Sequence, residues 1–412
     1  MTIIEFYDKA AIENIAGALL CDPDRVILVG HNQKKMQKSI LAYERVLAGK
    51  GKAVEFIPRS VTQNCLQGII DLLTELVETY EDCVFDLTGG EDLYLVAVGT
   101  VMSRYEGRVQ CHRFNFRNDK LYDCDADGNV CAVSSFDITA EDQISIYGGE
   151  LVTDPGRELC TYPWQFSRDF TCDIESMWEI CRKDPRLWNA HIGTLGDICE
   201  AFTSSEDLAV TFDRDTAKTV MKQKGVPYAF SPGIMFGLQK HGLIRDLVLQ
   251  DTVTFTFKNE QVKRCLTVAG QILELAIASR LRSITDKDGL PLYNDIRVGI
   301  VIDWDGADEN DTYRTVNEID ILAMKGSIPI FISCKNGWFD VNELYKLNTV
   351  AERFGNEYAR TVLVTTELSQ TDERAKYLRA RAKDMNVRFV EDPDSMTEKE
   401  LEKELRSLWS NS

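Results

Sequence analysis

The sequence has no stretch of about 18 consecutive apolar residues, the length that a membrane-spanning helix needs. Its first residues, MTIIEFYDKAAIENI, lack the basic start and the apolar run of a signal peptide. Its twelve cysteines include no C-x-x-C pair, which argues against a zinc ribbon, and they are scattered as reduced cysteines of cytosolic proteins are. We therefore expect a cytoplasmic protein with no membrane partner.

An excess of basic residues is also missing. The 47 Lys and Arg residues stand against 66 Asp and Glu residues, which gives a net charge of −19. This balance counts against a broad basic surface that coats a nucleic acid, but not against an enzyme that grips one phosphate through a cation and a few local basic residues. With 412 residues, the chain is long enough for two or three domains with cores of their own.

Short apolar stretches alternate with longer amphipathic ones over the first 116 residues. We expect strands at 2–7, 25–30, 53–57, 83–87 and 109–116, and helices at 10–20, 34–47, 63–80 and 93–105. This alternation is typical of an α/β fold in which helices doubly wind a mostly parallel, Rossmann-like sheet. A last strand at 144–152 is expected to close this domain.

In such a sheet, ligands bind where loops follow the carboxyl ends of the strands. Three of these loops contain the candidate ligand-binding residues Tyr7, Asp8, Lys9, Gly30, His31, Asn32, Thr88, Gly89, Gly90 and Glu91. In the third loop, two glycines would let backbone N–H groups approach an anion and Thr88 would add a hydroxyl; a tight strand-to-helix turn is the alternative explanation. Because no G-x-G-x-x-G follows the first strand, the fold is not one that binds nicotinamide dinucleotides.

The stretch NEIDILAMKGSIPIFISCKNG, residues 317–337, predicts two strands joined by a turn at 325–327. Alternation places Glu318 and Asp320 on one face of the first strand, and Ser333 and Lys335 on one face of the second. Carboxylates suit Mg²⁺ or Mn²⁺, and a nearby ammonium can hold or activate a water beside a phosphate. A solvated edge hairpin with scattered charges is the alternative.

This hairpin resembles the core of the PD-(D/E)XK nuclease superfamily, whose pattern is an acid on one strand and acid-x-Lys on the next. By resemblance, Asp320 is the first acid and Lys335 is the lysine, while Ser333 stands where the family has an acid. Two candidates replace that acid: Glu318 on the same strand face, and Glu274 on an amphipathic helix at 269–282. The resemblance therefore implies Asp320, Glu318 and Glu274 as metal ligands.

The elements around the hairpin fit the same resemblance. We expect a strand at 296–304 before it, and a helix at 341–354, a strand at 361–365, a helix at 371–385 and a strand at 387–390 after it. The second helix has a basic stretch that lies along a nucleic-acid backbone or, in the commoner case, is a solvated face.

The N-terminal half resembles the CRISPR-associated Rossmann-fold (CARF) sensor domain in the phrases EFYDKAAIENI, ILVGHN and FDLTGGEDLYLVAVG. That family binds cyclic oligoadenylates across the two-fold axis of a homodimer. The resemblance implies that the ring contacts the three loops named above.

We therefore expect a CARF sensor domain at 1–152, a small helical, winged-helix-like connector at 153–260 and a restriction-endonuclease-like PD-(D/E)XK domain at 261–412. The pair resembles CRISPR ancillary nucleases, which implies a homodimer that cyclic tetra-adenylate activates, and that cleaves DNA or RNA with Mn²⁺ or Mg²⁺ in type III antiviral defence. Two alternatives stay open. One is a cyclic-oligoadenylate-gated, nucleic-acid-binding regulator with an inactive nuclease fold; the other is a phosphodiesterase whose sensor loops degrade the ring.

Overall fold

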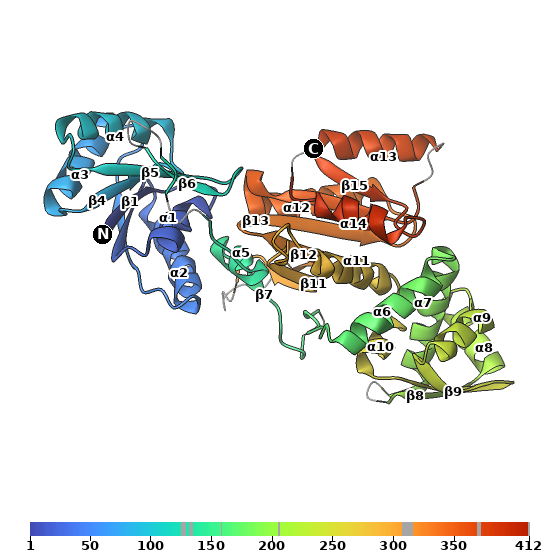
Figure 1. Ribbon diagram of the computed structural model, residues 1–412. Helices are drawn as coiled ribbons and strands as arrows, with labels where there is room; N and C mark the ends of the chain where they lie inside the picture. Colours follow the sequence, from blue (N-terminus) through green and yellow to red (C-terminus); the bar gives the residue numbers. More distant parts are fainter. Residues whose placement is uncertain are drawn as a thin grey trace.

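The computed structural model describes residues 1–124, 129–131, 135–157, 159–204, 207–306, 316–368 and 372–410. The chain is an α/β protein with two six-stranded sheets, each packed with helices (Figure 1). A small three-stranded sheet is formed by the middle of the chain. In the part of the chain that is described, no helix is both long and apolar enough to cross a membrane.

The first sheet has the strand order β3-β2-β1-β4-β5-β6. Its strands are β1 Thr2–Phe6, β2 Arg25–Gly30, β3 Glu55–Ser60, β4 Cys83–Asp86, β5 Gln110–Asn115 and β6 Lys120–Asp123. The connecting helices are α1 Glu13–Cys21, α2 Gln33–Gly49, α3 Leu66–Thr79 and α4 Asp92–Arg104. All pairings are parallel except that of β5 with β6. The side chains of α1 and α2 belong to one core cluster and those of α3 and α4 to another, so the prediction of a doubly wound sheet is confirmed.

The prediction of a strand at 144–152 that closes this sheet is wrong. Residues Ala140–Ile146 form helix α5, because Thr139 and Asp142 make a capping box that satisfies the first backbone N–H groups of a helix. Strand β7, Glu150–Leu151, follows this helix and pairs antiparallel with a strand of the second sheet. The end of the N-terminal half is therefore built into the C-terminal half.

The middle of the chain forms a helical unit with a small antiparallel sheet of order β8-β10-β9. Its elements are α6 Arg168–Cys181, α7 Pro185–Phe202, β8 Ala209–Asp213, α8 Arg214–Lys224, α9 Pro232–Lys240, β9 Ile244–Leu249, β10 Thr252–Phe257 and α10 Glu260–Cys265. Val253, Phe255 and Phe257 are buried, as their alternation predicts. The core of this unit continues into the second sheet, because Met177 and Leu195 belong to the same cluster as Ile332.

The second sheet has the strand order β15-β14-β13-β12-β11-β7. Its remaining elements are α11 Gln271–Ser283, β11 Asp295–Asp303, β12 Val316–Lys325, β13 Ile328–Lys335, α12 Val341–Gly355, a 3-10 helix Asn356–Tyr358, β14 Arg360–Thr365, α13 Glu373–Asp384, β15 Val387–Glu391 and α14 Glu398–Arg406. The predicted hairpin and the predicted order of strands and helices around it are confirmed. The strands β13, β14 and β15 are parallel, whereas β11, β12 and β13 are antiparallel.

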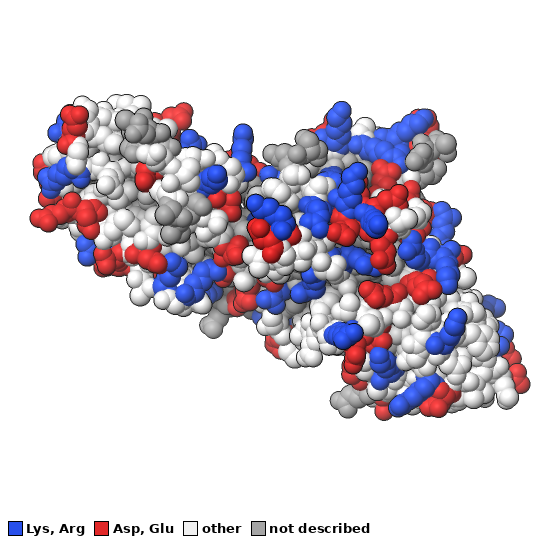
Figure 2. All heavy atoms as spheres, in the orientation of Figure 1, with Lys and Arg blue, Asp and Glu red and all other residues white. Residues whose placement is uncertain are grey.

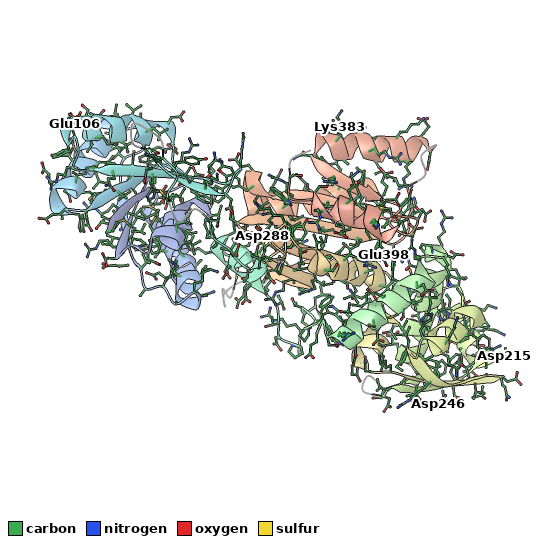
Figure 3. The ribbon with its side chains drawn as sticks, viewed as in Figure 1. Glu106, Asp215, Asp246, Asp288, Lys383 and Glu398 are labelled. Carbon is green, nitrogen blue, oxygen red and sulfur yellow. The ribbon has the colours of Figure 1, made fainter. Side chains whose placement is uncertain are left out.

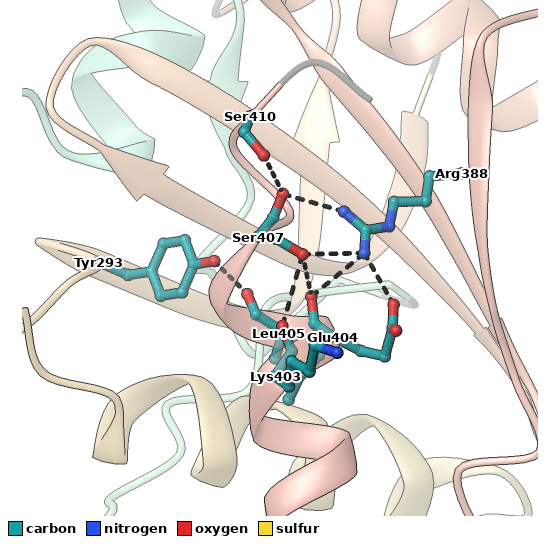
Figure 4. A network of polar contacts seen from close by, with 7 residues as sticks. All are labelled: Tyr293, Arg388, Lys403, Glu404, Leu405, Ser407 and Ser410. Carbon is teal, nitrogen blue, oxygen red and sulfur yellow. Dashed lines mark hydrogen bonds and ion pairs between the residues drawn. The ribbon is translucent and has the colours of Figure 1, made fainter.

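Polar contacts fasten the last helix to this sheet (Figure 4). Arg388 of β15 donates hydrogen bonds to the carboxylate of Glu404, at 2.7 Å, and to the carbonyl oxygen of Ser407, at 2.9 Å. The hydroxyl of Tyr293 donates to the carbonyl oxygen of Leu405. The carbonyl oxygens of Leu405 and Ser407, at the end of α14, thereby gain partners outside the helix.

The two halves meet along helix α5. The Gln143 side chain donates to the carbonyl oxygen of Phe354 at 2.6 Å, and Arg353 donates to the carbonyl oxygen of Tyr147 at 2.8 Å. Apolar side chains of α1, α2, α5 and α12 form one continuous core cluster. Helix α12 is therefore packed against the N-terminal half as well as against its own sheet.

Candidate functional site

The hairpin opens at the point where its predicted site residues lie. The recorded pairing of β12 with β13 runs from Lys325 and Ile328 to Ile321 and Ile332. The next residues on the two strands are Asp320 and Ser333, which therefore stand where the strands separate. Such a fork leaves backbone and side-chain groups of both strands accessible to one small ligand.

The Asp320 carboxylate organises this fork. One of its oxygens, Oδ2, accepts hydrogen bonds from the Ser333 hydroxyl at 3.0 Å and from the backbone N–H of Cys334 at 2.6 Å. The Lys335 ammonium lies 3.4 Å from the same oxygen. Three of the predicted residues are thus brought together, and Ser333 acts as a donor to the carboxylate.

A fourth group, Glu343 in the first turn of α12, was not predicted. Its Oε2 lies 3.1 Å from the Lys335 ammonium, and its Oε1 lies 2.9 Å from Lys346. Burial would lower the pKa of Lys335, but the carboxylates of Asp320 and Glu343 outweigh that effect and raise it. Lys335 is therefore held as an ammonium ion between two carboxylates.

These side chains line one pocket of about 320 Å³. The polar residues in its lining are Asn317, Glu318, Asp320, Ser333, Lys335, Glu343 and Lys346. Its volume is near the lower end of the range of roughly 300–1,000 Å³ that is usual for ligand sites. The pocket holds both signs of charge, as a site for a phosphate and a cation requires.

Glu274 does not line this pocket, but it is near enough to Asp320 and Glu318 for their charges to act on it. It belongs to α11, whose Leu273 and Ile277 pack in the cluster on one face of the sheet, whereas α12 packs on the other. Burial raises the pKa of Glu274 well above its ordinary value, and the charges of Asp320 and Glu318 raise it further. Burial and the charge of Asp320 also raise the pKa of Glu318. Burial and the charge of Asp320 therefore both disfavour the ionised forms of Glu274 and Glu318.

The fit of a hard cation follows from this donor set. Among the described residues, no three His, Cys, Asp or Glu side chains already stand as a ligand set for a metal ion. The carboxylates of Asp320, Glu318 and Glu274 nevertheless repel one another electrostatically, which a bound cation would relieve, and oxygen donors are those that Mg²⁺ and Mn²⁺ prefer. The chemistry of the donors fits the cation, and their side chains would have to turn toward it.

The middle unit of the chain contacts this site through Asn336, the residue after Lys335. The buried Asn336 side chain donates to Asn189 of α7 at 2.8 Å and accepts from the Thr366 hydroxyl at 3.0 Å. The side chain of Asn189 in turn donates to the backbone oxygen of Asn336. This reciprocal pair fixes the end of β13 to the middle unit and orients the backbone next to Lys335.

In the N-terminal half, the structure brings the three predicted loops together at one edge of the sheet. We call residues 7–9, 30–32 and 88–91 the edge loops. The backbone N–H of Gly90 donates to Asp8 at 3.1 Å, and His31 lies 3.2 Å from the Glu91 carboxylate. Hydrogen bonds therefore connect the third edge loop to each of the other two. Lys9 and Asn32 of these loops are exposed.

The two glycines are required by packing within this half. A Cβ atom at Gly89 would lie 2.8 Å from a carboxylate oxygen of Glu13, and one at Gly90 would lie 2.6 Å from the Cβ of Phe6. Gly90 also has a φ of +101°, which favours glycine. The tight turn explains both glycines without a ligand, so their approach to an anion stays a prediction.

Thr88 fits its predicted role least well. It is buried, and its hydroxyl donates to Asp86 and accepts from the backbone N–H of Phe114 at 2.9 Å. Asp86 also lies 3.0 Å from the buried His112. The hydroxyl is therefore engaged inside the sheet edge and turned away from the loop surface.

Sequence reasoning missed Glu343, Lys346 and Asn336. A signal for the first two was present, because the predicted helix at 341–354 buries Leu344, Leu347 and Phe354. Glu343 and Lys346 are one position before the first two of these, and hence flank the buried stripe, on the side of the hairpin. The contact of Asn336 with Asn189 joins residues 147 positions apart, and nothing local indicates it.

Comparisons with known proteins agree on the fold. The sequence matches no model of a known protein family, and no curated protein is significantly similar to it. Among solved structures, protein VC1899 from Vibrio cholerae superposes with a TM-score of 0.74 at 17% identity, over 100% of this chain and 99% of that one. Can2 from Sulfobacillus thermosulfidooxidans, solved in complex with cyclic tetra-adenylate (cA4), superposes with a TM-score of 0.68 at 15% identity, over 98% and 99%. At these identities the comparisons establish the shared fold, over the whole chain.

Proposed function

We propose that this protein is a nuclease that a cyclic oligoadenylate activates and that uses Mn²⁺ or Mg²⁺ to hydrolyse phosphodiester bonds in DNA or RNA. Residues 1–152 are the CARF sensor, 153–260 the connector and 261–412 the PD-(D/E)XK nuclease domain. Cyclic tetra-adenylate is the proposed activator and type III CRISPR defence the proposed setting. The protein acts in the cytoplasm.

The observation that carries this proposal is the arrangement of Asp320, Lys335 and Glu343 in one pocket at the fork of two strands. A carboxylate-rich pocket with a fixed ammonium is suited to a phosphodiester that approaches together with a hard cation. A regulator that only binds nucleic acid would gain nothing from an ammonium held between two half-buried carboxylates.

In this proposal each residue has a role that follows from its contacts. Asp320 is the central metal ligand, with Glu318 and Glu274 as the further acids. A bound cation would polarise the phosphoryl group and lower the pKa of the attacking water. Lys335 orients that water or a phosphate oxygen, Ser333 fixes the rotamer of Asp320 by its hydrogen bond, and Glu343 positions Lys335.

The edge loops are the proposed binding site for the cyclic oligoadenylate. Their position at the carboxyl ends of β1, β2 and β4 is where doubly wound sheets bind ligands. The cA4 in the structure of Can2, whose fold this chain shares, supports that choice of ligand. Helix α4 follows the third loop, and its residues Leu95 and Val96 are 47% and 54% exposed; a homodimer formed beside the loops would cover them.

One assay tests the proposed function. Purified protein is incubated with plasmid DNA and with RNA, with and without cyclic tetra-adenylate and Mn²⁺, next to an Asp320→Asn variant. We expect cleavage only by the unchanged protein and only with Mn²⁺, at a rate at least about fivefold higher when cyclic tetra-adenylate is present. Cleavage by the Asp320→Asn variant, or in excess EDTA, would contradict the assignment. Binding of nucleic acid that depends on cyclic tetra-adenylate, without cleavage, would favour the alternative of a nucleic-acid-binding regulator. Degradation of cyclic tetra-adenylate would favour the alternative of a phosphodiesterase.

A further inference from the structure

Three large aromatic side chains of the C-terminal half are exposed. Trp338, Tyr377 and Tyr345 are 64%, 50% and 41% exposed. Trp338 is three residues after Lys335, so the chain between them spans at most about 11 Å. Its neighbours Gly337, with a φ of +129°, and the buried Phe339 turn the chain and hold the indole at the surface.

Arginines from α13 accompany these rings. The Arg374 guanidinium lies 3.9 Å from the centre of the Trp338 ring, and its side chain also donates to the carbonyl oxygen of Phe339 at 3.2 Å. Arg374, Tyr377 and Arg381 are spaced i, i+3 and i+7, which places them on one face of the helix. Arg381 donates to the hydroxyl of Tyr345 at 2.9 Å and thereby connects the surfaces of α13 and α12. We call Trp338, Tyr345, Arg374, Tyr377 and Arg381 the aromatic platform.

Helix α12 contributes residues both to the platform and to the pocket. Tyr345 is next to Lys346, which lines the pocket together with Lys335 and Glu343. Lysine and arginine side chains also gather over the region of α13, as Figure 2 shows against the view of Figure 1. At the far end of the helix, Lys383 projects away from the sheet (Figure 3). A chain that passed from the pocket onto α13 would therefore meet rings and positive charges in turn.

The chemistry of the platform selects its occupant. Exposed aromatic rings next to arginines stack unpaired bases, while the arginines balance backbone phosphates. A protein partner would also accept the rings, but the basic neighbours on an otherwise acidic chain favour a polyanion. A hollow of about 150 Å³ beside Trp338 is smaller than the roughly 300 Å³ of typical enclosed ligand sites, so a base would stack on the surface and would not be enclosed.

We propose that the aromatic platform stacks unpaired bases one or a few nucleotides from the phosphate that is cut, and that the substrate is single-stranded nucleic acid. This inference rests on the proposed nuclease function. It specifies that the substrate is single-stranded and names the residues that distinguish it from a duplex. In a duplex the bases are stacked on one another and offer no free face to Trp338, so a duplex loses this contact.

The test measures binding without cleavage. Full-length protein carrying Asp320→Asn, with cyclic tetra-adenylate present, is titrated into fluorescent single-stranded DNA, single-stranded RNA and a duplex of the same sequence. Trp338→Ala and Trp338→Phe are added to this background. Phe236→Ala, which removes a ring that is 58% exposed on α9, serves as the matched control. Thermal melting verifies that each variant is folded.

We expect Trp338→Ala to weaken the binding of both single strands roughly tenfold, as loss of one stacked base does. Trp338→Phe should retain most of the affinity, and duplex binding and the Phe236→Ala control should be unchanged. Unchanged single-strand binding in Trp338→Ala, an equal loss for the duplex, or no binding of nucleic acid by the parent protein would overturn the platform. An effect on one strand type alone would assign the substrate as DNA or RNA. Trp338→Ala could weaken single-strand binding as expected while the unchanged protein, which has Asp320, cleaves no nucleic acid. In that case the nuclease proposal fails, but the proposed binding surface is supported.

Discussion

The hydroxyl of Tyr358 donates a hydrogen bond to the carboxylate of Glu13, and this contact joins the two halves of the molecule. Glu13 lies in the first turn of α1 and directly beneath Gly89 of the edge loops. Tyr358 ends the short 3-10 helix that follows α12, and its ring stacks on Phe116 at 4.4 Å. Because α12 also carries Glu343, a single packed element connects the edge loops with the partner of Lys335.

The first prediction concerns this connection. Tyr358→Phe removes the hydroxyl but keeps the aromatic side chain that stacks on Phe116. The variant should therefore fold, and it should bind cyclic tetra-adenylate with little change in affinity. The ratio of cleavage rates with and without cyclic tetra-adenylate should fall at least about fivefold, which is the lower end of the usual coupling between sites. Rates and calorimetric ring affinity are measured on the same preparation. An unchanged ratio would show that activation takes another route.

The second prediction uses the acidity of Glu13. Burial raises the pKa of this carboxyl from 4.5 to about 7, so the folded protein holds its proton more tightly than the unfolded chain does. The contribution of Glu13 to stability is therefore full at low pH and is lost as the pH rises from about 4.5 to about 7.

Glu13→Gln removes this titration. The variant should melt at nearly the same temperature as the parent near about pH 5 and at a higher temperature near about pH 8. Scanning fluorimetry at both values measures the difference between the two proteins, which cancels other titrating groups. A difference that is independent of pH would show that Glu13 is not protonated in the folded state.

A third prediction concerns the residue at the position of the missing acid. Ser333→Ala removes one hydrogen bond to Asp320, worth about 1 kcal/mol, and should therefore lower the cleavage rate by no more than about fivefold. If Ser333→Ala proves as damaging as Asp320→Asn while Glu318 and Glu274 are dispensable, the serine itself takes part in the chemistry.

A fourth prediction distinguishes the roles of Glu318, Glu274 and Glu343. Gln substitutions at Glu318 and Glu274 should each lower the single-turnover rate, and loss of the true ligand should cost at least about a hundredfold. We expect Glu318→Gln to be partly rescued by more Mn²⁺, because Glu318 shares the strand face of Asp320, whereas Glu274 positions water or a second ion. Glu343→Gln should lower the rate without such rescue, because Glu343 contacts Lys335. A reversed order of rescue would assign the metal ligand to α11 or α12.

Much of the fold follows from local patterns in the sequence. The apolar stretches that became β1, β2 and β4, and the alternation at 317–337 that became the hairpin, were predicted because period and turn residues are local signals. The segment 144–152 was predicted wrongly because its apolar residues fit either a strand or a helix. The capping box of Thr139 and Asp142 just before it decides for the helix.

The candidate sites were predictable in part. The residues of the edge loops follow strands, where a sheet gathers its loops, whereas those of the hairpin lie within β12 and β13, where alternation indicates their shared face. The inward turn of Thr88, the contact of Asn336 with Asn189 and the pairing of Lys335 with Glu343 depend on which helix packs on which face. Only the tertiary structure fixes that choice.

The central claim is that ring binding at the edge loops switches on cleavage in the pocket of Asp320 and Lys335. The most direct measurement is the single-turnover cleavage rate of a single-stranded oligonucleotide in Mn²⁺, with saturating cyclic tetra-adenylate and without it. We predict a rate at least about fivefold higher with the ring, and no cleavage by Asp320→Asn under either condition. Equal rates with and without the ring, or cleavage that survives in Asp320→Asn, would contradict the account.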